Sequence, residues 1–156
     1  MGKKHWLMKT EPDSFSISDL KNRINQQEHW DGVRNYQARN HMRDGMSVGD
    51  DVLFYHSSCT PAGIVGLAVI VKSAYPDPSA LAPDSKYYDP KASPIKNPWV
   101  MIDIQLKREF TAMLTLESLR KVPGLENMLL LKKGMRLSIQ PVTSEEFAIL
   151  LKLAKN

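Results

Sequence analysis

The sequence has a single cysteine, Cys59, and four histidines that lie far apart. One thiol cannot form an intrachain disulfide, and scattered imidazoles lack the spacing of a zinc site. A lone cysteine also suits a reducing compartment. We therefore expect a chain that folds without a disulfide and holds no metal.

Glycine-rich motifs and long apolar runs are lacking as well. There is no Gly-x-Ser-x-Gly elbow, phosphate-cradling loop or dinucleotide fingerprint, so we expect no cofactor and find little support for catalysis by familiar routes. No apolar run could cross a bilayer, and residues 1–6 lack the apolar stretch of a signal peptide. We expect no membrane partner and a cytoplasmic location, or a nuclear one in a eukaryote.

The composition fits one domain over residues 1–156, because 42% hydrophobic content supplies a core at this length. The 21 basic and 17 acidic residues give a formal charge of +4, which permits an anionic partner without requiring one. A basic cluster such as Lys132-Lys133 is interpreted as a solvated surface unless several clusters share one face. We expect a monomer.

The hydrophobic pattern predicts five strands, at residues 5–10, 51–57, 64–73, 99–106 and 136–140. Helices are expected at residues 18–27, 35–42 and 115–121, and a last helix begins at a capping box formed by Thr143 and Glu146. No regular alternation of strand and helix is visible. The sequence therefore predicts an α+β fold, a small and strongly bent mixed sheet or partly closed β-barrel with several short helices.

Residues 75–98 contain six of the ten prolines, and Tyr87, Tyr88 and Trp99 lie at or beside the end of this segment. Loops of this length are uncommon in compact domains and often form lids or binding loops. A surface insertion is an equally valid interpretation. The aromatic residues favour a wall of a binding site.

Residues 30–40, Trp-Asp-Gly-Val-Arg-Asn-Tyr-Gln-Ala-Arg-Asn, combine rings, amides and guanidiniums around a predicted turn. An extruded nucleobase needs such groups, because rings stack on it, amides read its edge and cations meet the flanking phosphates. Trp30 lies between His29 and Asp31 and is predicted to face a ligand, whereas Trp6 and Phe54 are predicted to be core. This segment favours binding over bond breaking.

Two other functions remain open from the residues alone. The strand end at Tyr55, His56 and Ser57 could add a ring and polar groups to a binding cleft. The alternative, less favoured because no motif surrounds these residues, is an enzyme of nucleotide or RNA metabolism with His56 as a base for a Ser or Cys nucleophile. A protein-interaction module with a vestigial pocket is a third interpretation.

Several segments resemble the EVE domain family. They are Lys-Thr-Glu-Pro at 9–12, residues 30–40, Phe-Tyr-His-Ser at 54–57, Pro-Ala-Gly-Ile-Val-Gly at 61–66, Tyr-Asp-Pro at 88–90, Asn-Pro-Trp at 97–99 and Arg-Leu-Ser-Ile-Gln-Pro at 136–141. The resemblance spans nearly the whole chain in order. It implies a PUA-like fold, a small bent β-barrel related to ASCH and YTH domains, and a non-catalytic reader of a modified base in DNA or RNA.

The resemblance also implies roles for particular residues. Trp30 and Trp99 become cage walls, Tyr55, His56 and Ser57 the pocket floor, and Asn35 with the backbone near Val33 the edge readers. Lys9, Arg34 and Arg39 would hold phosphate or brace the pocket. One extra methyl group gains on the order of 1 kcal/mol from burial, so roughly tenfold discrimination is expected.

Overall fold

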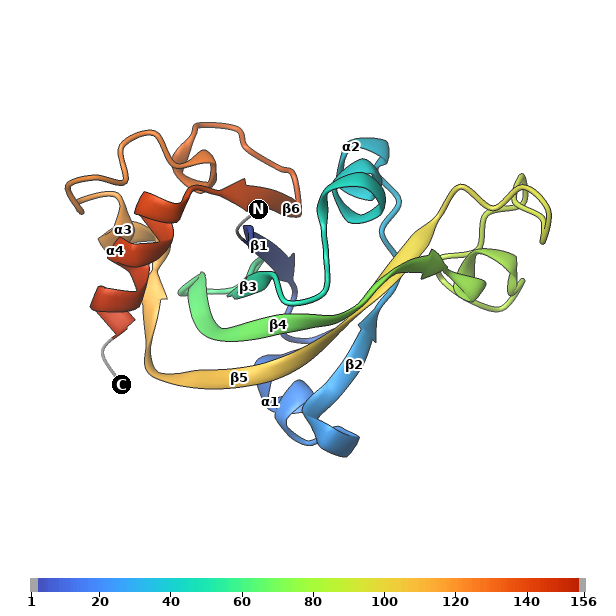
Figure 1. The fold of residues 1–156 in the computed structure, drawn as a ribbon, viewed down its shortest axis with the longest axis horizontal. Helices are drawn as coiled ribbons and strands as arrows, with labels where there is room; N and C mark the ends of the chain where they lie inside the picture. The colour runs from blue at the N-terminus through green and yellow to red at the C-terminus, as the bar shows by residue number, and fades with distance from the viewer. Residues whose placement is uncertain (1–2, 155–156) are drawn as a thin grey trace.

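The structure, a computed structural model, describes residues 3–154 as one mixed sheet of six strands in the order β2-β5-β4-β3-β1-β6 (Figure 1). The strands are β1 (His5–Thr10), β2 (Gln27–Trp30), β3 (Asp51–His56), β4 (Gly63–Pro76), β5 (Val100–Thr115) and β6 (Ile139–Val142). β1 and β3 are parallel, and the other neighbours are antiparallel. The predicted mixed α+β fold is confirmed. Because β2 and β6 are opposite edges that do not pair among the described residues, the sheet is open rather than a closed barrel.

Short helices lie between the strands, and α4 follows the last strand. They are α1 (Ile17–Lys21), η1 (Ile24–Gln26), α2 (Tyr36–Asn40), η2 (His41–Gly45), η3 (Pro78–Leu81), α3 (Leu116–Leu119), η4 (Leu129–Leu131) and α4 (Ser144–Ala154). The capping box before α4 is confirmed, since Glu146 donates its backbone N–H to Thr143 Oγ1 at 3.1 Å and accepts from Thr143 N at 3.1 Å. The first helix is shorter than predicted. It ends at Lys21 with Asn22 as its C-cap, and Asn25 and Gln26, with φ of 57° and 55°, lie outside the helical conformation.

Two hydrophobic clusters occupy the two faces of the sheet. In β3, Val52 and Phe54 belong to one cluster, while Leu53 and Tyr55 belong to the other. Residues of α1, α2 and η2 pack with the first cluster, and α4 packs with the second (Figure 1). Alternate side chains of β3 thus point to opposite faces, as predicted. Both faces of the strand are covered, so neither set of side chains is exposed.

Several strands differ from the prediction. β4 and β5 were predicted at residues 64–73 and 99–106 but extend to Pro76 and Thr115, because they pair with each other along most of their length. β2 was missed, because Gln27–Trp30 is a polar edge strand without apolar alternation, yet it pairs with β5 so that Trp30 lies opposite Ile102. β6 begins at Ile139 instead of residue 136, since its pairing with β1 starts where Ile139 meets Met8. Trp30 therefore lies at the end of a strand and is held by the sheet.

Candidate functional site

A hollow of about 570 Å³ opens where the end of β2 meets the segment after β1 and the loop of residues 75–98. We call it the Trp30 pocket. Its volume falls in the range of roughly 300 to 1,000 Å³ that is usual for small-molecule sites. Its rings are Phe15, His29, Trp30 and Tyr87, and its charged residues are Lys9, Glu11, Arg23, Glu28, Asp31, Arg34 and Lys86.

The aromatic surface of the Trp30 pocket rests on the core. The half-buried Trp30 ring meets Phe54 edge-on, with 5.7 Å between ring centroids and 78° between planes. Phe15 packs on Phe54 from another side at 6.2 Å, and the Arg23 guanidinium lies 5.2 Å from the Phe15 ring. Because Phe54 is fully buried, both rings have a rigid support while part of each stays open to the pocket.

Gly32 lets the Pro-rich loop approach closely. Its φ is +79°, and a Cβ atom at this position would lie 2.5 Å from the Tyr87 ring. Only glycine adopts this backbone conformation without strain and also leaves room for the ring. Tyr87 therefore lies directly against the turn after Trp30, and the interpretation of residues 75–98 as a wall is supported.

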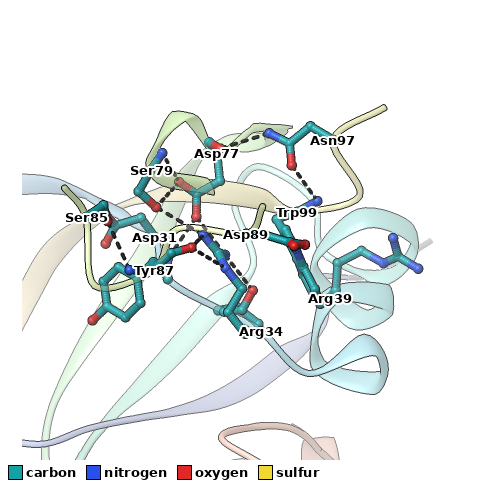
Figure 2. Close-up of polar contacts among 12 residues, drawn as sticks. Asp31, Arg34, Arg39, Asp77, Ser79, Ser85, Tyr87, Asp89, Asn97 and Trp99 are labelled. Atoms are coloured by element: carbon teal, nitrogen blue, oxygen red, sulfur yellow. Dashed lines mark hydrogen bonds and ion pairs between the residues drawn. The ribbon is translucent and has the colours of Figure 1, made fainter. Parts of the chain in front are cut away.

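A buried ion pair fixes this wall (Figure 2). The Asp77 carboxylate, whose side chain is 0% exposed, accepts hydrogen bonds from the Gly32 N–H at 2.9 Å, the Ser79 hydroxyl at 2.6 Å and Arg34 Nη1 at 3.2 Å. Burial acts to raise the pKa of Asp77, but these hydrogen bonds outweigh it and hold the pKa below its ordinary value. Arg34 also donates twice to the Tyr87 carbonyl, at 2.9 and 2.8 Å. The network joins the turn to the loop.

Asp31 is a half-buried carboxylate that takes no part in this network. It lines the Trp30 pocket, and its Oδ2 lies 3.9 Å from His29 Nε2, which is too long for a hydrogen bond. Burial first, and then the charge of Asp77, raise the pKa of Asp31 above its ordinary value. A half-buried acceptor of this kind is suited to a ligand N–H.

The structure brings together four of the predicted site residues, Lys9, Trp30, Val33 and Arg34, around the Trp30 pocket. Lys9 donates to the Met135 carbonyl at a long 3.5 Å, and burial lowers its pKa. Asn35 caps α2, because its Oδ1 accepts from the Ala38 N–H at 2.9 Å. Asn35 is thus a helix cap outside the Trp30 pocket, where the resemblance implied an edge reader.

The predicted floor does not line the Trp30 pocket. Tyr55 is 3% exposed and belongs to the cluster on the other face of the sheet. His56 Nε2 accepts from the Ile17 N–H at 3.1 Å, and burial lowers the pKa of this imidazole. Ser57 donates its backbone N–H to Thr10 at 2.9 Å. Tyr55 therefore packs in the core of an interior strand, whereas His56 and Ser57 are held by hydrogen bonds to Ile17 and Thr10.

Trp99 is not a cage wall of the Trp30 pocket either. It is 5% exposed, its indole N–H donates to Asp89 at 2.8 Å, and Arg34 lies 5.2 Å from its ring. Arg39 donates to the Pro98 carbonyl at 2.8 Å. Trp99 and Arg39 therefore hold the loop in place. Figure 2 shows both residues to one side of the Arg34 network.

Sequence reasoning did not assign Phe15, Asp31, Asp77 or Tyr87 to specific roles. Tyr87 had a signal, an aromatic ring in a long Pro-rich loop, whereas Asp77 had none because its partner Gly32 is 45 residues away. Among residues 3–154, no group of three metal-ligating side chains forms a cation site. Within the same range, no helix is long and apolar enough to cross a membrane.

Comparison with known proteins gives consistent relatives. The sequence profile described as EVE domain matches residues 4–153. Human thymocyte nuclear protein 1 is 44% identical over 166 residues, covering 96% of this chain and 73% of that protein.

Solved structures agree with this result. A crystal structure of human THYN1 in complex with 5-methylcytosine-containing DNA has a TM-score of 0.91 and 43% identity, covering 99% of both chains. A crystal structure of a Pseudomonas syringae protein has a TM-score of 0.91 and 53% identity, covering 96% of this chain and 99% of that one. Since the profile match and the high structural similarity both extend over nearly the full chain, this protein belongs to the EVE domain family.

Proposed function

We propose that this chain binds nucleic acid and takes one modified base, flipped out of its strand, into the Trp30 pocket. The observation that carries the proposal is the half-buried Trp30 ring at a hollow of about 570 Å³, beside the rings of Phe15, His29 and Tyr87 and the Asp31 carboxylate. The solved complex of human THYN1 with 5-methylcytosine-containing DNA supports the same ligand class, with modified cytosine the first candidate.

The pocket offers the interactions that a flipped base requires. Stacking on an aromatic ring contributes about 1 to 3 kcal/mol per base, which is similar to the few kcal/mol that unstacking costs. Hydrogen bonding must therefore add to stacking. Cytosine presents an exocyclic amine, and a carboxylate is a natural acceptor for it. We assign that acceptor role to Asp31.

The enzyme alternative receives no comparable support from the geometry. His56 lies outside the lining of the Trp30 pocket, and its Nε2 already accepts a backbone hydrogen bond from Ile17. A general base needs a free nitrogen within reach of the substrate. In our proposal His56 has a structural role, which is to position the start of α1.

The proposal is tested by titrating short DNA duplexes, and the matching RNAs, that carry one 5-methylcytosine or an unmodified cytosine. We expect the wild type to prefer a modified ligand by roughly five- to tenfold, because methyl burial is worth on the order of 1 kcal/mol. Trp30→Ala should weaken binding of that ligand about tenfold or more through lost stacking and should abolish the preference.

Tyr88→Ala is the control, since it also removes an accessible aromatic ring, and Tyr88 is exposed outside the Trp30 pocket. It should retain the preference, and circular dichroism should confirm that both variants are folded. If folded Trp30→Ala keeps the full preference for the modified base, the pocket assignment is wrong. Turnover of a nucleotide or RNA that disappears in His56→Ala with binding retained would favour the enzyme.

A further inference from the structure

A second set of cations lies outside the Trp30 pocket. Lys132, Lys133 and Arg136 are exposed, and none of their side chains makes a hydrogen bond or ion pair with another residue in the range 3–154. Together with Asn35 and Gln37, they line a hollow of about 410 Å³. We call these three residues the basic loop. All three line the same hollow, so they present their charges on one face of the molecule.

The basic loop adjoins the Trp30 pocket. Lys9 lines that pocket, and its side chain reaches the carbonyl of Met135 inside the loop at 3.5 Å. The Lys9 backbone N–H also donates to the Ser138 carbonyl at 2.8 Å, and Ser138 lines the pocket itself. Figure 1 shows the segment before β6 running from the side of α3 and α4 toward α2. A bound strand could therefore pass from one hollow to the other.

The charge around the basic loop favours a polyanion. The lining of the second hollow contains three cations and no carboxylate. Like charges held close together without counterions repel one another, and an anionic chain relieves that repulsion. Arg136 could engage a phosphate with two parallel hydrogen bonds, while the two lysines act as point charges. The predicted phosphate ligands Arg34 and Arg39 are instead hydrogen-bonded to the protein itself.

We propose that the basic loop binds backbone phosphates of the same nucleic acid whose flipped base occupies the Trp30 pocket. This inference rests on the proposed function. Phosphate contacts fix the register of the strand and carry no base information. The basic loop therefore sets affinity and its dependence on salt, whereas the Trp30 pocket sets the preference for the modified base.

The test compares two double variants that remove the same net charge. Lys132→Ala/Lys133→Ala changes the basic loop, and Lys121→Ala/Lys152→Ala changes exposed lysines near α3 and on α4. Affinity for a short duplex with one 5-methylcytosine, and for its unmodified counterpart, is measured over a series of salt concentrations. The plot of log affinity against log salt has a negative slope. We expect the basic-loop variant to make this slope less steep by about 1.8, since each lost phosphate contact removes about 0.9. The control should change the slope far less.

The outcomes separate the two proposals. An unchanged slope in the basic-loop variant, with the base preference present in the wild type, overturns this inference alone. A reduced slope in a protein that shows no base preference supports the basic loop and contradicts the proposed function. A wild type that binds none of these nucleic acids at low salt overturns both. Arg136→Ala provides a second variant, with an expected slope change of about 0.9.

Discussion

The two groups of cations near the Trp30 pocket differ in what they contact. Arg34 and Arg39, which belong to the aromatic segment of residues 30–40, are hydrogen-bonded to the loop of residues 75–98. Lys132, Lys133 and Arg136 lie 90 or more positions later and have no such partners among the described residues. The two arginines that lie in the aromatic segment therefore hold the loop in place. The cations that can meet a ligand are those of the basic loop, far away in the sequence.

The two groups differ because only the two arginines lie next to hydrogen-bond acceptors of the loop. The loop of residues 75–98 presents the Asp77 carboxylate and the Tyr87 and Pro98 carbonyls to the arginines. A guanidinium has five donors in a fixed fork, so one arginine can join several such acceptors. Arg34 uses this capacity in full and is only 23% exposed. The side chains of the basic loop have no such acceptors as partners among residues 3–154 and are exposed.

The largest expected effect comes from breaking the braced group. Asp77→Ala should lower the free energy of unfolding by about 3 kcal/mol, because it leaves Arg34 and the Gly32 N–H without their buried acceptor. Urea unfolding followed by circular dichroism measures this change. Asp44→Ala is the control, since the Arg43–Asp44 pair is exposed to solvent and should contribute little to stability. Equal losses in the two variants would contradict the bracing role.

The pH dependence of the same variant gives a second check. The folded pKa of Asp77 is lowered, so its stabilising contribution is present above the unfolded pKa and is lost as the pH falls through the folded value. The stability difference between wild type and Asp77→Ala should therefore be largest near neutral pH and shrink in acid. A difference that grows on acidification would contradict the assignment.

Gly32→Ala should have an intermediate effect. The positive φ of Gly32 costs an alanine about 1 to 2 kcal/mol, and the new methyl group would push the Tyr87 ring out of place. Gly49→Ala is a matched control, because Gly49 has a φ of +96° and open space around it. Both variants should lose stability in thermal unfolding, but only Gly32→Ala should also weaken binding of the modified base. Equal binding by the two variants would show that Tyr87 does not contribute to binding of the base.

The smallest effect is expected for Asp31→Asn. The pKa of Asp31 is raised, so the folded protein binds its proton more tightly than the unfolded chain, and ionisation costs stability above the folded pKa. The amide that replaces the carboxylate carries no charge, so the variant should be slightly more stable near neutral pH, and its advantage should fade in acid. It should also bind the base more weakly. Asp84→Asn, an exposed position on the Pro-rich loop, should show neither change.

The sequence predicted those parts of the molecule whose signals are local. β3 and the cap of α4 depend on alternation and on residues three positions apart, and both are confirmed. β2 was missed, because an edge strand can be polar throughout. Trp30 and Trp99 look alike as residues, and what separates them is a hydrogen bond from Trp99 to Asp89 that only the folded loop creates. Which residues line a site is thus decided by contacts that form only in the folded chain.

The most direct test of the account is fluorine NMR of the protein labelled with fluorotryptophan, which reports on all three tryptophans at once. The Trp30 signal is assigned through Trp30→Phe, and a duplex with one 5-methylcytosine is then added. The account predicts a large shift of the Trp30 signal, with Trp6 and Trp99 nearly unchanged because both are buried away from the Trp30 pocket. A shift of Trp99 with Trp30 unmoved would contradict it.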